Sequence, residues 1–124
     1  KVKIIIPKRS DVGLVDILRN KYLGNVYGSN VHIYFYVPQN LHAKLFLVDQ
    51  ETFILGSSNF DYRSFRFQHE INLVGSNKDI IKLLNKHFEA SMLDSESFDY
   101  EFWQKRSPLQ KFFELVLVPF RHFF

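Results

Sequence analysis

The sequence contains no cysteine, which excludes a disulfide-bonded scaffold, a thiolate metal site and a thiol nucleophile. It also has no apolar run of the roughly 18–20 residues that a membrane-spanning helix requires. Internal repeats and low-complexity linkers are absent, and no spacing of metal ligands is present, so we expect neither a metal ion nor a cofactor. Charged residues make up 23% of the chain against 46% hydrophobic residues, which excludes disorder caused by composition.

The length of 124 residues corresponds to one domain with a core. A chain of this size buries roughly two-thirds of the surface that it exposes when unfolded. The net charge is +3, from 16 Lys and Arg against 13 Asp and Glu. This charge suits an anionic substrate or an anionic membrane face, and is lower than that of a dedicated nucleic-acid binder.

Apolar alternation predicts strands, and apolar residues at helical spacing predict helices. The predicted strands are residues 1–7, 31–37, 41–48, 52–55 and 71–74. Helices are predicted over residues 12–23, with Ser10 or Asp11 as the N-cap, and over residues 78–92, with a loop at 24–30 and a short helical turn or loop at 61–67. Strands interleaved with helices indicate an α/β fold, with a single mixed β-sheet flanked by helices.

We expect a domain over residues 1–107 and an amphipathic helical tail over residues 108–124, interrupted near Pro119. The tail has two interpretations. As an interfacial anchor, it would place phenylalanines at the acyl boundary of a membrane and basic side chains near anionic head groups: Lys105, Arg106, Lys111 and Arg121. Alternatively, its apolar face packs against its own sheet or against another half of the protein.

One segment, residues 41–60, stands above the background because it contains His-x-Lys-x4-Asp followed by Gly-Ser-x-Asn. On a strand, His42 and Lys44 project from the same face, since side chains alternate. Gly56 permits a tight bend that brings Ser57 and Asn59 to the same place. Lys44, Ser57 and Asn59 then form a pocket of hydrogen-bond donors that fits a phosphate.

Phosphodiester chemistry explains this set. Lys44 and Asn59 would neutralise and orient the phosphate oxygens where charge develops in the transition state. Imidazole is partly unprotonated at neutral pH, so a histidine can attack phosphorus and form a phosphoryl-histidine that passes the group to water or an alcohol. Asp49 would repel the phosphate, so we expect it to be a structural acceptor for the motif's backbone or for Lys44.

Three further residues keep two interpretations each. Glu70 could accept a hydrogen bond from an imidazole N–H and fix its tautomer, or it could be a solvated carboxylate on an edge strand. Ser57 could instead serve only as a hydrogen-bonding group within its turn. Arg63 could contact phosphate or anchor its loop through Asp61.

These positions resemble the HKD motif of the phospholipase D superfamily. The flanks are similar to those of bacterial cardiolipin synthases: Tyr36-x-Pro38-x-x-Leu41-His42-Ala43-Lys44 and Asn59-Phe60-Asp61-x-Arg63-Ser64. One departure is Gln68-His69 before Glu70, where the family would have an Asn and an apolar residue. The resemblance implies a phospholipase D-like half domain. It also implies a membrane-associated phosphatidyl transferase of the bacterial cytoplasmic membrane, which makes cardiolipin and glycerol from phosphatidylglycerol without a cofactor.

The resemblance further implies two HKD motifs per active site, one whose histidine attacks phosphorus and one whose histidine protonates the leaving alcohol. This chain has one motif, since its other histidines have no lysine two positions later. The second motif lies either in the same longer chain, which the tail favours, or in a second copy. His42 is then the acid/base histidine rather than the nucleophile, and Glu70 orients either His42 or the partner half's histidine. The expected catalytic residues are His42, Lys44, Asp49, Asn59 and Glu70.

Two other functions remain open. The same site could belong to a phosphodiester hydrolase, either a phospholipase D or a metal-independent nuclease that binds nucleic acid. Alternatively, the chain could be an inactive lipid-binding or interaction module that keeps the fold without a complete site.

Overall fold

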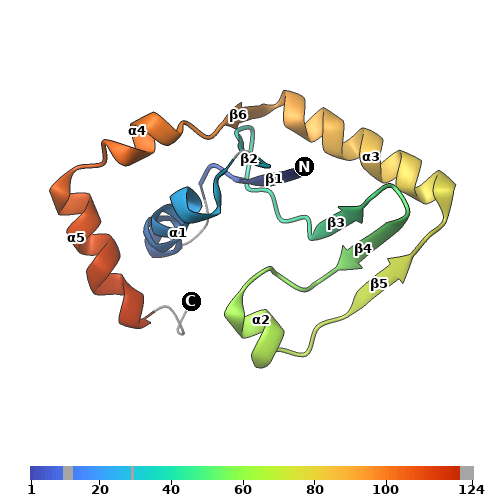
Figure 1. Ribbon diagram of the computed structural model, residues 1–124. Helices are drawn as coiled ribbons and strands as arrows, with labels where there is room; N and C mark the ends of the chain where they lie inside the picture. The colour runs from blue at the N-terminus through green and yellow to red at the C-terminus, as the bar shows by residue number, and fades with distance from the viewer. Residues whose placement is uncertain (10–12, 29, 121–124) are drawn as a thin grey trace. The chain divides into compact units, whose positions relative to one another are not determined.

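The computed structural model, described over residues 1–9, 13–28 and 30–120, divides into two compact units (Figure 1). The first comprises the described residues of the segments Lys1–Leu41 and Asp94–Phe124, and the second is His42–Leu93. Each unit contains one three-stranded sheet. The α/β class is therefore confirmed, whereas the prediction of a single mixed sheet is wrong. Alternation within a strand does not specify which strands pair, because pairing depends on hydrogen bonds between distant segments.

The sheet of the first unit has the order β1-β2-β6. Strands β1 (Val2–Pro7) and β2 (Val31–Tyr36) are parallel, and helix α1 (Gly13–Val26) connects them, as a parallel pair requires. Both strands confirm the sequence prediction. Strand β6 (Ser95–Ser97), antiparallel to β2, was not predicted, because its three residues, Ser-Glu-Ser, carry no apolar alternation.

The core of the first unit forms around Ile33, which lies in β2 and is 2% exposed. Leu23 of α1 and Phe98, which follows β6, are the other buried residues of this cluster. Partly buried side chains pack around them: Ile4, Ile6, Val31, Phe35, Tyr100 and Trp103. Because the aromatic members come from the last third of the chain, that part is integral to this core.

Helix α1 confirms the predicted helix but continues through Gly24 and Asn25, which were predicted to lie in a loop. The indole of Trp103 packs against the helix at Gly24, where an added Cβ would lie 2.0 Å from the ring. This glycine therefore provides space for a tryptophan rather than ending the helix. Val12 and the predicted N-caps, Ser10 and Asp11, lie outside the described residues.

Two helices complete the first unit, α4 (Tyr100–Gln104) and α5 (Pro108–Leu117). The Ser107 side chain caps α5 by accepting a hydrogen bond from the Gln110 amide at 3.2 Å. A 3-10 turn over Val118–Phe120 follows, which confirms the predicted interruption near Pro119. Helix α5 packs against α1. A domain boundary after residue 107 stays a prediction.

The second unit has an antiparallel sheet of order β3-β4-β5 and two helices. Its elements are β3 (Leu45–Val48), β4 (Thr52–Gly56), α2 (Tyr62–Arg66), β5 (Asn72–Gly75) and α3 (Lys78–Leu93). All were predicted to within a few residues, except that β3 begins at Leu45 rather than at residue 41. Phe53 of β4 and Ile81 of α3 are the buried apolar residues of this unit. Within the described ranges, no helix is long and apolar enough to cross a bilayer.

Candidate active site

Three segments of the second unit meet at one edge of its sheet, where β3 begins, β4 ends and β5 begins. The pairs Leu45–Leu55 and Gly56–Asn72 set this register. Backbone hydrogen bonds extend the pairing by one residue in each case. The Gly56 amide donates to the Lys44 carbonyl at 3.2 Å, and the Ser57 amide donates to the Ile71 carbonyl at 3.0 Å. This edge brings together the segments that carry most of the predicted site residues: His42, Lys44, Ser57, Asn59 and Glu70.

His42 and Lys44 lie directly before β3. The His42 side chain is exposed, Lys44 is half-buried, and the Lys44 ammonium donates to the backbone carbonyl of His42 at 2.8 Å. This bond holds the lysine against its own motif and leaves two ammonium hydrogens for an anion. Regular strand geometry starts only at Leu45, so the common face of His42 and Lys44 stays a prediction.

Ser57 and Glu70 form the polar link of this edge. The Ser57 hydroxyl donates to Glu70 Oε2 at 2.5 Å and accepts from the Ile71 amide at 3.0 Å. A hydroxyl–carboxylate bond of this length is a short, charge-assisted one. It ties the end of β4 to the start of β5, so Ser57 serves the frame of the site here. Its role as a phosphate donor stays a prediction.

Gly56 is needed for space at this edge. An added Cβ would lie 2.2 Å from Asn72 Oδ1 and 2.3 Å from the Ile71 carbonyl oxygen, both on the neighbouring chain segment. No described glycine has a positive φ, so the reason for this glycine is the close approach of β5. The expected tight bend of the backbone is not what requires it.

Asn59 is exposed between β4 and α2, and the residues after it form a capped helical turn. The Asp61 carboxylate accepts from the Ser64 amide at 2.7 Å and thereby caps α2. The Phe60 ring packs against Phe46 of β3, with 5.7 Å between ring centroids. These contacts fix the segment that carries Asn59.

Asp49 lies at the opposite end of β3. Asp49 and Gln50 form the hairpin turn with φ of 50° and 57°, and the Glu51 amide donates to the Val48 carbonyl at 3.0 Å. Aspartate tolerates this left-handed conformation better than most residues. Four strand residues, roughly 13 Å, separate the turn from Lys44. Asp49 is therefore brought to neither His42 nor Lys44, and its position suits a structural role in the turn.

The sequence interpretation did not single out a basic pocket in the first unit, lined by Lys8, Arg9 and Tyr36 among others. The two adjacent cations directly after β1 were the available signal. Lys8 is paired with Glu96 at 2.7 Å. Arg19 supports the pocket from behind, because its guanidinium donates to the carbonyls of Pro7 at 2.7 Å and Lys8 at 3.2 Å. Burial lowers the pKa of Arg19, and the nearby Asp16 carboxylate opposes that shift.

Comparison with known proteins points in one direction. The family model described as cardiolipin synthase, PLD-like domain, matches residues 1–92. The chain is 32% identical over 115 residues to a cardiolipin synthase of Listeria monocytogenes serotype 4a (strain HCC23), which covers 93% of the chain and 24% of that protein. It is 33% identical over 105 residues to a cardiolipin synthase of Geobacillus sp. (strain WCH70), covering 85% of the chain and 21% of the relative.

A probable cardiolipin synthase of Bacillus subtilis (strain 168), YwiE, is 26% identical over 106 residues, which are 86% of this chain and 21% of that protein. The chain thus spans between a fifth and a quarter of the length of these relatives. No solved structure matches it.

Proposed function

Because the chain belongs to the PLD-like domain family of cardiolipin synthase, we propose that it supplies one of the two HKD motifs of a phosphatidyl transferase. The reaction would move a phosphatidyl group from one phosphatidylglycerol to a hydroxyl of another, giving cardiolipin and glycerol. One observation carries the proposal. The segments bearing the motif converge on a single sheet edge within the part of the chain that matches the family.

The proposed chemistry has two displacements at phosphorus. In the first, one histidine forms an N–P bond as the P–O bond to glycerol breaks, and the second histidine protonates the glycerol oxygen. In the second, that histidine takes the proton from a hydroxyl of another phosphatidylglycerol, whose oxygen attacks phosphorus and breaks the N–P bond. We assign the acid/base role to His42 and the phosphoryl-bearing role to the histidine of the other half.

The remaining residues of the edge would stabilise charge. The two free ammonium hydrogens of Lys44 and the Asn59 amide would donate to the non-bridging phosphate oxygens, where negative charge builds in the transition state. Glu70 keeps one carboxylate oxygen, Oε1, beside the one that accepts from Ser57. That oxygen would accept from an imidazole N–H and keep the ring in a reactive tautomer.

The need for a second half has support in the second unit itself. Leu73 and Val74 are adjacent in β5, so they point to opposite faces, and they are 62% and 61% exposed. A strand with apolar side chains uncovered on both faces is typical of one that another layer covers in the complete protein. The chain's share of its relatives' length is consistent with such a covering half.

The test measures transfer with vesicles of labelled phosphatidylglycerol, comparing the full-length protein with its His42→Asn variant. We expect cardiolipin and glycerol from the unmodified protein, and a loss of at least about a hundredfold in the variant, which is the usual contribution of an acid/base group. The matched control is His87→Asn, an exposed histidine on α3, which should change the rate less than twofold.

The other outcomes each contradict the proposal in a defined way. Phosphatidic acid as the only product would indicate a hydrolase. Cleavage of single-stranded DNA without added metal would indicate a nuclease. An unchanged rate in His42→Asn would indicate that the motif is not catalytic and would support an interaction module.

A further inference from the structure

Helix α5 is oriented with its apolar side outward. Glu114 is buried on the side that faces the first unit, and Gln110 is half-buried. The large apolar side chains of the helix are between 45% and 65% exposed: Leu109, Phe112, Phe113, Leu115 and Val116. A surface helix ordinarily turns its apolar side to the core, so this arrangement is inverted.

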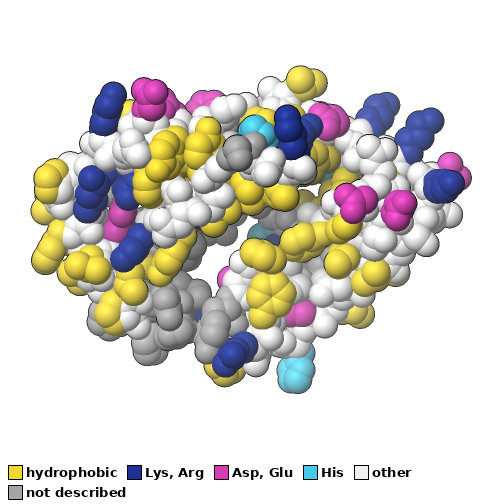
Figure 2. Space-filling model, viewed as in Figure 1, with side chains coloured by type: hydrophobic (Ala, Val, Ile, Leu, Met, Phe, Trp, Pro, Cys, Tyr) yellow, Lys and Arg dark blue, Asp and Glu magenta, His cyan; other side chains and the backbone are white. Residues whose placement is uncertain are grey.

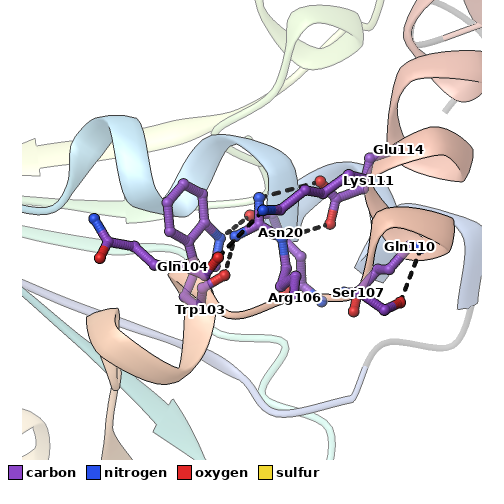
Figure 3. A network of polar contacts seen from close by, with 8 residues as sticks. All are labelled: Asn20, Trp103, Gln104, Arg106, Ser107, Gln110, Lys111 and Glu114. Atoms are coloured by element: carbon purple, nitrogen blue, oxygen red, sulfur yellow. Dashed lines mark hydrogen bonds and ion pairs between the residues drawn. The ribbon is translucent and has the colours of Figure 1, made fainter.

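A buried ion pair holds the helix in this orientation (Figure 3). Arg106 donates to Glu114 through Nε at 2.9 Å and through Nη2 at 3.3 Å, and the two side chains are 11% and 3% exposed. The guanidinium stacks 3.7 Å above the Trp103 ring, and the Trp103 indole N–H donates to the Asn20 carbonyl of α1 at 2.6 Å. Rotating α5 to bury its phenylalanines would separate this pair and leave a buried charge unpaired, which is strongly unfavourable.

The charges next to the apolar side are basic. Residues 105–117 contain three cations, Lys105, Arg106 and Lys111, and one carboxylate, Glu114. Glu114 is buried and neutralised by Arg106, so Lys105 and Lys111 are the exposed charges of this segment. Figure 2 shows hydrophobic side chains over α5, at the left of the view, with basic side chains beside them. An apolar stripe bordered by exposed lysines is complementary to an anionic lipid surface.

We propose that α5 seats this protein on an anionic lipid surface, with the axis of the helix in the plane of the interface. This inference rests on the proposed function, since the lipid substrate would lie in that surface. A helix of 10 residues is roughly 15 Å long, half the roughly 30 Å of the hydrocarbon core, so it lies on the bilayer and does not cross it. The phenylalanines enter the acyl boundary, while Lys105 and Lys111 remain among the head groups.

Vesicle sedimentation tests the proposal with the full chain. The double variant Phe112→Ser/Phe113→Ser should bind vesicles of phosphatidylglycerol and phosphatidylcholine at least about tenfold more weakly than the unmodified protein. The matched control is Leu83→Ser/Leu93→Ser, two apolar residues of α3 that are 68% and 89% exposed, and should bind within about twofold of the unmodified protein. Equal binding by both double variants would overturn the proposal. So would equal binding to vesicles of phosphatidylcholine alone.

A site-specific probe separates lipid from protein as the occupant. These 124 residues contain no cysteine, so Val116→Cys accepts an environment-sensitive dye here at one position. We expect its emission to shift to the blue only when anionic vesicles are added, whereas a dye on Leu83→Cys should not respond. Emission already shifted without lipid would show that another part of the protein covers α5, which overturns the proposal.

Two further measurements keep this inference distinct from the proposed function. His42→Asn should keep normal vesicle binding, because the site lies in the second unit. Phe112→Ser/Phe113→Ser should keep its activity on a soluble short-chain phosphodiester, because neither residue is in the site. If vesicle binding is normal but no variant has activity, the proposed function fails while the lipid-seating role of α5 stands.

Discussion

Replacing Glu114 with alanine should destabilise the first unit by about 3–5 kcal/mol, because the change leaves the Arg106 guanidinium buried without its counter-charge. The structure places this pair in the buried class, since the exposed fractions are 11% and 3%. An exposed pair would be worth less than about 1 kcal/mol. Arg106 keeps its contact with the Trp103 ring, a cation–π interaction worth about 0.5–2 kcal/mol, so we expect the lower end of the range.

Urea unfolding measured by tryptophan fluorescence is the appropriate assay, because Trp103 is the one tryptophan of these 124 residues and packs directly against Arg106. The matched control is Glu101→Ala, an exposed carboxylate on α4, for which we expect a change below about 0.5 kcal/mol. The double variant Arg106→Met/Glu114→Leu removes both charges and should recover most of the loss.

Two results would refute this reasoning. A loss below about 1 kcal/mol in Glu114→Ala would mean that the pair behaves as a solvent-screened one. A double variant as unstable as the single variant would mean that the cost comes from lost packing and not from an unpaired charge. In either case the ion pair would no longer explain why α5 turns its apolar side outward.

Three other substitutions test the packing. Gly24→Ala should destabilise the first unit by about 1–3 kcal/mol in urea unfolding, although alanine favours helices, because its methyl group overlaps the Trp103 ring; added stability would contradict this. Gly56→Ala should lower phosphatidyl transfer at least about tenfold, because a Cβ 2.3 Å from the Ile71 carbonyl separates β4 from β5 at the site; normal transfer would show that the edge adjusts. Asp49→Val should cost about 1–2 kcal/mol and Asp49→Asn much less, because asparagine also tolerates a φ near 50°; equal losses would show that the carboxylate charge matters instead.

Local structure was predictable wherever a residue's neighbours in sequence determine it. The alternation in β2, the helical spacing in α3 and the proline after α5 all predicted their elements correctly. The errors arose from contacts between distant residues. Gly24 lies in a helix because Trp103, 79 positions later, fills the space beside it. Strand β6 exists because Phe35 of β2 pairs with Glu96, which local composition does not indicate.

The candidate site shows the same division. The spacing around His42 indicated the chemistry, because few frameworks need that set of residues at those intervals. It could not show that Asp49 lies in a hairpin turn at the far end of β3, because strand length and turn conformation separate the two residues in space. Nor could it show that Ser57 donates its hydroxyl hydrogen to Glu70, since that contact depends on the pairing of β4 with β5.

The pairing also bears on which histidine Glu70 orients. His42 precedes β3 and Glu70 precedes β5, so β4 lies between their strands and separates them by two strand spacings, roughly 10 Å. The bond to Ser57 fixes the Glu70 carboxylate at the end of β4 and uses one of its oxygens. The remaining oxygen, held in place in this way, suits an imidazole that approaches from outside the sheet edge better than one that must reach across β4. Glu70 is therefore better placed to orient the partner half's histidine than to orient His42, and a second half would complete the hydrogen bonding of this site as well as its histidine count.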